Sequence, residues 1–254
     1  MEEKTVKVNG ENILSFQGGR GPNLLLLPSA GGRGKEYSLL FPLLIPHFTV
    51  FSLDYPGFGK SEEIEQIEGV ETLAGFILSW METLELKMVF LTGFSMGGAV
   101  AMHMALKKPE VIQKLCLIAT AAGNNEKVKI ISPVGMGLKE ILNKFYFRPE
   151  VKELIERKKL SPEDKREIHR SSRAFARLAE RKRVFVDILD RLGAIQIPTL
   201  VIGAAEDQAV PVPFQEAIFK ALPNARLKVY PETGHFVIIE RAQEVACDLI
   251  DYFQ

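Results

Sequence analysis

The chain has 254 residues, 46% of them hydrophobic, which is enough apolar material for one large domain or two small ones. This excludes a disordered chain and a small disulfide-stapled domain. Lysine plus arginine and aspartate plus glutamate each number 32, so the formal net charge is zero and a nucleic-acid partner is not expected. No apolar run reaches the roughly 18 residues of a membrane span, so we expect a soluble, cytoplasmic protein without a membrane partner.

The first half of the chain alternates short apolar runs, typical of buried strands, with segments of helical periodicity. It begins with a hairpin predicted over Thr5–Val8 and Ile13–Gln17. Further strands are predicted at Asn23–Leu27, Val50–Leu53, Met88–Thr92 and Lys114–Ala119, and helices at Tyr37–Ile45, Val70–Leu84 and Met96–Lys107. This alternation predicts an α/β protein with a mostly parallel central sheet flanked by helices.

A segment of different composition interrupts the alternation. Between Lys144 and Arg191 there are 15 Lys and Arg against 9 Asp and Glu, and the predicted helices are Pro149–Lys159 and Pro162–Arg183. The alternation then resumes with strands at Thr199–Ile202 and Leu227–Tyr230 and helices at Pro213–Leu222 and Ala242–Phe253. We therefore predict a helical insertion over residues 122–192 within one core domain formed by residues 1–121 and 193–254. Its positive charge would favour acidic substrates near a covered site, although solvated surface faces are the simpler interpretation.

The strongest local signal is Gly93-Phe94-Ser95-Met96-Gly97-Gly98, which lies between a predicted strand and a predicted helix. A serine on so tight a turn has a strained backbone, so the positions two before and two after it must carry almost no side chain. Gly93 and Gly97 meet that requirement. The turn presents the Ser95 hydroxyl at a helix N-terminus, which favours a developing anion. The motif predicts a nucleophilic serine, and a plain glycine-rich turn is the alternative.

A nucleophilic serine needs a base to take its proton, and the chain has four histidines. His47 ends the first predicted helix, His103 lies within the third, and His169 lies among charged residues, so each is interpreted as a surface or hydrogen-bonded structural histidine. His235 differs, because it directly follows the predicted strand Leu227–Tyr230. Loops at the carboxyl ends of strands are where sites form in open α/β sheets, so His235 is the predicted base.

The base needs an acid that fixes its tautomer and stabilises the imidazolium. Asp207, in the loop after Thr199–Ile202, is the best candidate between Ser95 and His235 in the chain. Glu206 is the alternative, since a shift of one residue in that loop would exchange the directions of the two side chains. The order is then serine, acid and histidine, each after a different strand.

Taken together, these motifs give the whole chain a resemblance to the α/β-hydrolase superfamily. Residues 93–98 resemble its nucleophile elbow, Asp207–Pro211 its acid loop and residues 234–236 its histidine loop. Asp54–Ser61 (DYPGFGKS) is similar to the family's D-x-x-G-x-G-x-S turn. The resemblance implies that Ser95, Asp207 and His235 form a catalytic triad and that the insertion is the family's helical cap, or lid.

The resemblance also implies an oxyanion hole made of backbone amides. By position, these are the N–H groups of Ala30 and Met96. Members commonly carry His-Gly at the start of the loop before the first donor, whereas this chain has Pro28–Gly32 (PSAGG). Backbone donors do not depend on side-chain identity, so the hole can survive this change.

Aromatic residues are candidates for the substrate pocket. Phe58 and Phe94 lie beside the predicted catalytic loops. Phe145, Phe147 and Phe175 of the insertion would line an acyl pocket, although packing of the cap on the core is the more common reason for such residues.

We predict hydrolysis of a small-molecule acyl substrate, a carboxylic ester or thioester: Ser95 attacks the carbonyl, His235 transfers the proton and Asp207 orients His235. The alternatives are a carbon–carbon bond hydrolase of the meta-cleavage-product type, acyl transfer to an acceptor other than water, and a non-catalytic ligand-binding member of the fold. No residue cluster has metal-ligand spacing and no phosphate-binding loop is present, so we expect no metal and no cofactor. Cys116 and Cys247 are interpreted as small core residues.

Overall fold

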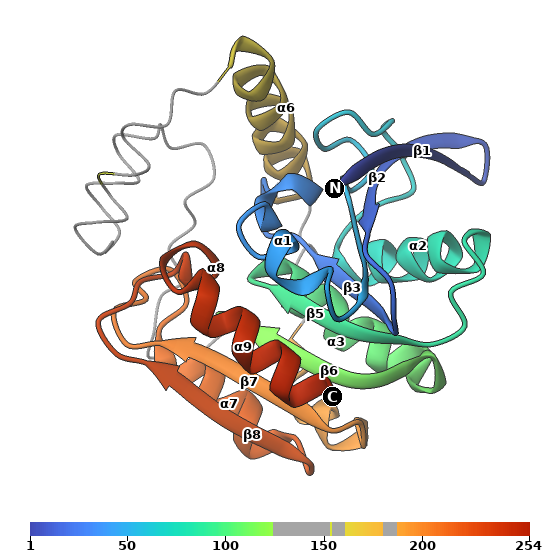
Figure 1. The fold of residues 1–254 in the computed structure, drawn as a ribbon. Helices are drawn as coiled ribbons and strands as arrows, with labels where there is room; N and C mark the ends of the chain where they lie inside the picture. Colours follow the sequence, from blue (N-terminus) through green and yellow to red (C-terminus); the bar gives the residue numbers. More distant parts are fainter. Residues whose placement is uncertain (124–152, 154–160, 180–186) are drawn as a thin grey trace.

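The computed structural model describes residues 1–123, 153, 161–179 and 187–254 (Figure 1). One eight-stranded sheet runs through the described part, in the spatial order β1-β2-β4-β3-β5-β6-β7-β8. The strands are β1 (Glu2–Val8), β2 (Glu11–Gly18), β3 (Asn23–Leu27), β4 (Thr49–Leu53), β5 (Val89–Phe94), β6 (Ile112–Ile118), β7 (Thr199–Ala204) and β8 (Ala225–Tyr230). β2 pairs antiparallel with β1 and β4, and all other neighbours are parallel, so the prediction of a mostly parallel sheet is confirmed.

Helices cover both faces of the sheet (Figure 1). The first face packs against α2 (Val70–Thr83), α3 (Met96–Lys107) and α7 (Val212–Ala221), and the second against α1 (Phe41–Leu44), α8 (Val237–Glu240) and α9 (Ala242–Phe253). Short 3₁₀ helices lie at Gly34–Tyr37, Pro109–Val111 and Leu189–Ala194. This is the flanked sheet that the alternating pattern predicts.

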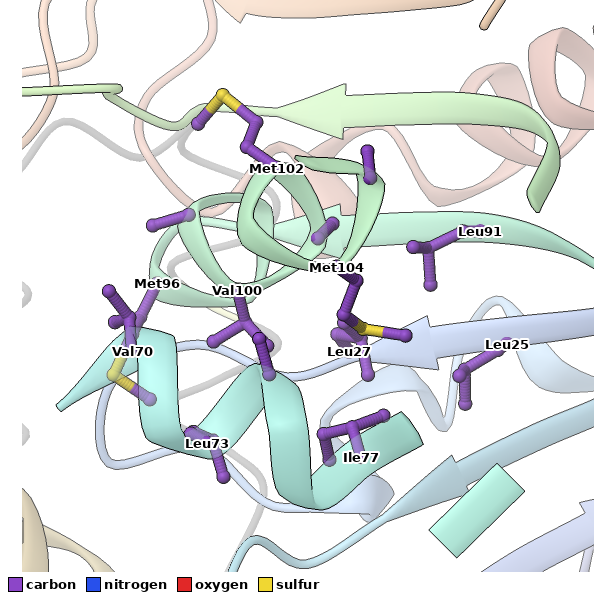
Figure 2. Close-up of a cluster of buried hydrophobic side chains, with 14 of the residues drawn as sticks. Leu25, Leu27, Val70, Leu73, Ile77, Leu91, Met96, Val100, Met102 and Met104 are labelled. Atoms are coloured by element: carbon purple, nitrogen blue, oxygen red, sulfur yellow. The ribbon is translucent and has the colours of Figure 1, made fainter. Parts of the chain in front are cut away.

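The alternation of side chains along each strand explains the two apolar layers. In β3, Leu25 and Leu27 belong to the core of the first face, and Leu24 and Leu26 to that of the second. Figure 2 shows the first core, where side chains of α2 and α3 meet those of β3 and β5. A central strand buried on both sides must be apolar at every position, which is why this one has four leucines in succession.

The predicted helix Tyr37–Ile45 is wrong. The chain instead forms a 3₁₀ turn that ends at Tyr37, and then α1, which has only four residues. Two prolines explain the difference: Pro42 has no N–H to donate to the carbonyl of Ser38, and Pro46 cannot extend α1. The spacing of apolar residues alone does not reveal that prolines remove helical hydrogen bonds here.

The prediction for the two cysteines holds for one of them. Cys116 is buried in β6, but Cys247 is exposed on α9. The buried residues of α9 are Val245, Ala246, Leu249 and Phe253, and position 247 falls on the opposite side of the helix.

α6 (Pro162–Ala179), with 18 residues, is the longest helix in the described ranges, and it carries many charged side chains. Along the chain it lies between β6 and β7, which are neighbours in the sheet. Within the described part of the chain, no helix is both long and apolar enough to cross a membrane.

Candidate functional site

Ser95 occupies a strained turn between β5 and α3. Its φ of 53° and ψ of −118° lie in a region that residues with a side chain rarely adopt. Its N–H donates to the carbonyl of Ile118 (2.8 Å), and its own carbonyl accepts the hydroxyl of Thr120 (2.7 Å). These bonds from β6 and the loop after it offset the strain and fix the serine at the carboxyl end of the sheet.

The two glycines that the motif requires lie against backbone atoms. A Cβ added to Gly93 would lie 2.3 Å from the carbonyl oxygen of Gly97, and a Cβ on Gly97 would lie 2.1 Å from that of Leu27. Neither neighbour is a flexible side chain, so no larger residue fits. The close approach also places the start of α3 directly beside the end of β3.

The structure brings Ser95, His235 and Asp207 into one hydrogen-bonded chain. His235 Nε2 lies 3.1 Å from Ser95 Oγ, and His235 Nδ1 lies 2.8 Å from Asp207 Oδ2. The Asp207 side chain is fully buried, whereas Glu206 is exposed to solvent. Asp207 is therefore the acid that faces the histidine, and Glu206 is not.

Backbone donors orient the Asp207 carboxylate. Its Oδ1 accepts the N–H groups of Ala209 and Val210, both at 2.8 Å, and this leaves Oδ2 for His235. On the other side of the histidine, the N–H of Gly234 donates to Glu240 Oε1 (3.0 Å). Both loops are thus held by buried hydrogen bonds.

The other three histidines do not bond to Ser95. His47 and His169 are exposed, as expected for surface histidines. His103 is buried in α3, its Nε2 has no hydrogen-bond partner among the described residues, and burial lowers its pKa. The expectation that His103 is a surface or hydrogen-bonded histidine is therefore wrong at Nε2. The described ranges contain no group of three or more His, Cys, Asp or Glu side chains that could hold a metal ion.

The predicted oxyanion donors lie on either side of the contact between β3 and α3. Ala30 is half-buried in the loop after β3, and among the described residues no acceptor takes its N–H. Met96 is the first residue of α3, so its N–H has no carbonyl within the helix to bond. Both backbone amides are thus available as donors.

The predicted pocket aromatics have different surroundings. Phe94 is buried with its ring centroid 5.2 Å from that of His235, and Phe58 is buried edge-on to Tyr55 at 5.7 Å. Phe175 is a buried residue of α6 in the core of the first face. Phe145 and Phe147 lie outside the described residues.

Asp54 organises the turn at 54–61. Its Oδ1 accepts the N–H of Gly34 (2.9 Å), its Oδ2 accepts that of Lys60 (3.0 Å), and its backbone carbonyl accepts the Ser61 hydroxyl (2.7 Å). Burial raises the pKa of Asp54 to about 6. This geometry requires glycine at position 59, because a Cβ there would lie 1.9 Å from Asp54 Oδ2.

Ion pairs attach α6 to this part of the core. Arg33, in the loop after β3, bonds to Glu167 and to Asp164 (3.3 Å). Lys60 bonds to Glu163 (2.6 Å) and Glu167 (3.3 Å), and its ammonium holds the pKa of Glu163 below the usual value. α6 therefore contacts both the turn at 54–61 and the loop of the predicted oxyanion donor.

In two further contacts, the positive group belongs to α6 and the acceptor belongs to the core. Arg170 donates to the carbonyls of Gly59 (3.2 Å) and Ser61 (2.8 Å), and Arg177 pairs with Glu63 (3.0 Å). Two of the positive charges that distinguish Lys144–Arg191 are therefore used in attaching the helix.

Sequence reasoning missed Glu36, Arg33 and Thr120. Glu36 Oε2 accepts the N–H of Ser29 (2.8 Å), and Oε1 bonds to the Ser29 hydroxyl (2.6 Å). Burial raises the pKa of Glu36, and the Ser29 hydrogen bonds oppose that shift. In the sequence, a glutamate and an arginine after a glycine-rich loop look the same as solvated charges, so no signal marks them.

The sequence profile of the family described as serine aminopeptidase, S33, matches residues 39–242. The chain belongs to this family of α/β-hydrolases. A 2-hydroxy-6-oxo-6-phenylhexa-2,4-dienoate hydrolase of Comamonas testosteroni is 26% identical over 278 residues, covering 99% of this chain and 96% of the relative. A 2-hydroxy-6-oxononadienedioate/2-hydroxy-6-oxononatrienedioate hydrolase of Cupriavidus pinatubonensis is 27% identical over 240 residues, covering 89% and 83%.

Solved structures show the same fold. A meta-cleavage product hydrolase of Pseudomonas fluorescens has a TM-score of 0.81 at 19% identity, covering 98% of this chain and 97% of that one. A thermophilic esterase of Thermogutta terrifontis has a TM-score of 0.79 at 23% identity, covering 100% and 98%. The predicted fold is thus confirmed, and hydrolases that cleave different bonds share it.

Proposed function

We propose that this α/β-hydrolase cleaves a small carboxylic ester or thioester through an acyl-enzyme on Ser95. The observation that carries the proposal is the hydrogen-bonded chain from Ser95 through His235 to the buried Asp207. A serine activated by a histidine, which is oriented in turn by a carboxylate, is the arrangement that nucleophilic acyl transfer requires.

The reaction follows from these positions. Ser95 Oγ attacks the carbonyl carbon while its proton passes to His235 Nε2, and the carbonyl oxygen becomes an oxyanion bound by the Ala30 and Met96 amides. The C–O or C–S bond then breaks, and His235 returns the proton to the leaving group. Water, deprotonated by His235, attacks the acyl-enzyme, and collapse of the second oxyanion releases the acid while His235 returns the proton to Ser95 Oγ.

We further propose that residues 122–192 form a cap on a core of residues 1–121 and 193–254. The attachment of α6 to the 54–61 turn supports this division. We place the acyl group beside Phe58 and Phe94, because the ring of Phe94 packs against His235.

A second candidate is the hydrolysis of a carbon–carbon bond in a vinylogous diketo acid. Curated relatives at 26% and 27% identity are named as hydrolases of 2-hydroxy-6-oxo dienoates and related compounds, and these names support this candidate. The same three side chains would serve both reactions, so substrate turnover must distinguish them.

Labelling with a fluorophosphonate tests the proposed nucleophile. Ser95 should be modified, and Ser95→Ala should abolish labelling and lower the turnover of p-nitrophenyl acetate by about 10⁶-fold. Ser79→Ala, on α2, is the matched control and should behave as wild type. An unlabelled Ser95, or a Ser95→Ala variant with unchanged turnover, would refute the proposal and favour a non-catalytic ligand-binding protein.

A substrate panel then separates the two candidates. Short- and long-chain esters and thioesters are compared with 2-hydroxy-6-oxo-6-phenylhexa-2,4-dienoate by kcat/KM. A higher value for the esters or thioesters supports the first proposal. A higher value for the dienoate would replace it with carbon–carbon bond hydrolysis.

A further inference from the structure

Glu36 holds Ser29 through both oxygens of its carboxylate. The Ser29 N–H lies 2.8 Å from Oε2 and the Ser29 hydroxyl 2.6 Å from Oε1. The carboxylate fits there because position 32 is glycine: a Cβ on Gly32 would lie 2.6 Å from Glu36 Oε2 and 2.9 Å from Ser29 Oγ. The glutamate, the serine and the glycine thus form one small clamp.

This clamp determines where the Ala30 amide points. The Ser29 carbonyl accepts the N–H of Gly32 at 3.0 Å. A peptide group is planar and trans, so the N–H of Ala30 points away from the Ser29 carbonyl that shares its plane. Fixing the N–H, hydroxyl and carbonyl of Ser29 therefore fixes the direction of the Ala30 N–H.

Two buried tyrosines anchor the chain just before the clamp. The hydroxyl of Tyr37 donates to the carbonyl of Leu27 (2.8 Å), and that of Tyr55 donates to the carbonyl of Pro28 (2.9 Å). These bonds hold the chain up to Pro28, and the side chain that bonds the next residue is Glu36. The loop has no His-Gly at its start, so its support must come from elsewhere in the fold.

We propose that Glu36 is a positioning residue that orients the Ala30 amide as an oxyanion donor. The inference rests on the proposed function, since it requires an oxyanion to form on an acyl group bound to Ser95. Glu36 does not touch the reacting atoms, and it acts through Ser29 and the Ser29–Ala30 peptide.

Three substitutions separate positioning from charge and from general stability. Glu36→Leu removes both hydrogen bonds. Glu36→Asp keeps the charge, but it is one methylene shorter and does not reach both donors of Ser29. Glu36→Gln removes the charge, but its carbonyl can accept the N–H and its amide can donate to the hydroxyl. Glu62→Leu is the matched control, because Glu62 accepts the N–H (2.6 Å) and the side-chain amide (3.1 Å) of Asn12 in the same manner.

The experiment measures kcat, KM and Tm with p-nitrophenyl acetate, and kcat is divided by the number of sites that a fluorophosphonate titrates. A trifluoromethyl ketone, which forms an anionic adduct with the serine, reports the oxyanion site directly. We expect Glu36→Leu and Glu36→Asp to lower kcat by roughly 10²-fold, with KM unchanged. The binding of the trifluoromethyl ketone should weaken by a similar factor. Glu36→Gln and Glu62→Leu should remain close to wild type.

The outcomes are distinct. Wild-type kcat per titrated site in Glu36→Asp or Glu36→Leu would overturn the proposal, even if Tm falls, because the role would then be structural only. A loss of kcat in Glu36→Gln equal to that in Glu36→Asp would overturn it as well. If wild-type turnover does not depend on Ser95, both the proposed function and this inference fail, whereas unaffected Glu36 variants of a Ser95-dependent enzyme refute the inference alone.

Discussion

The turn around Ser95 and the attachment of α6 are held in place by different forces. At Ser95, buried backbone hydrogen bonds fix the turn, and close contacts between backbone atoms leave no room for larger side chains. α6 is attached by ion pairs, some of them open to solvent, such as Lys60–Glu163 (40% and 59% exposed), and by buried side chains such as Phe175. Exposed ion pairs contribute little stability and weaken in salt, whereas steric contacts do not respond to ionic strength. The comparison indicates a rigid turn at Ser95 and a more weakly held α6.

Among the substitutions that test this comparison, the largest effect is expected at the acid. In Asp207→Asn, the amide oxygen should take the place of Oδ1, because the N–H groups of Ala209 and Val210 both donate there. The NH₂ group then faces His235 and favours the tautomer with a proton on Nε2, which cannot accept the proton of Ser95. We expect kcat to fall by about 10⁴-fold, the size of effect seen for this change in a serine protease.

Glu206→Gln is the matched control for the acid, because its exposed side chain neighbours Asp207 in the same loop. Its kcat should equal that of the wild type. If Glu206→Gln were the variant that lost activity, the loop would present a different acid from the one that the geometry shows.

A steric change tests the rigid side of the comparison. In Gly97→Ala, the new Cβ would lie 2.1 Å from the carbonyl oxygen of Leu27, so β3 and α3 must separate. We expect the free energy of unfolding, measured in urea, to fall by about 3 kcal/mol. Gly75→Ala is the control, because it lies within α2 with no atom within 4 Å of its Cβ and should raise that free energy by about 0.5 kcal/mol. Equal effects at the two glycines would show that the contact between β3 and α3 is not tight.

The difference between the Ser95 turn and the attachment of α6 also explains which site residues could be predicted from the sequence. Ser95 and its glycines could be predicted because a strained turn leaves a local signature of residue types, and His235 and Asp207 because their order after successive strands adds a second constraint. The choice between Asp207 and Glu206 depends on one residue of loop geometry and needed the structure. Glu36 could not be predicted, because its carboxylate reaches its partner Ser29 only when the loop after β3 folds back. The attachment of α6 likewise depends on pairs of charges that are distant in sequence, such as Arg33 and Glu167, and these leave no pattern along the chain.

Ionic strength tests the weakly held side of the comparison. Glu167 bonds to both Arg33 and Lys60, so Glu167→Gln removes the charge that joins the two contacts of α6. Because Asp164 remains beside Arg33, we expect a loss of only about 1.4 kcal/mol, which appears as roughly tenfold faster hydrogen exchange of the α6 amides at low salt. In the wild type, the same amides should exchange faster as NaCl rises to about 1 M, while those of α3 do not change.

Glu244→Gln, which breaks the exposed Arg241 pair on α9, should leave α6 exchange unaltered. Salt-independent exchange of α6 in the wild type would mean that apolar contacts such as those of Phe175, and not the ion pairs, hold this helix to the core.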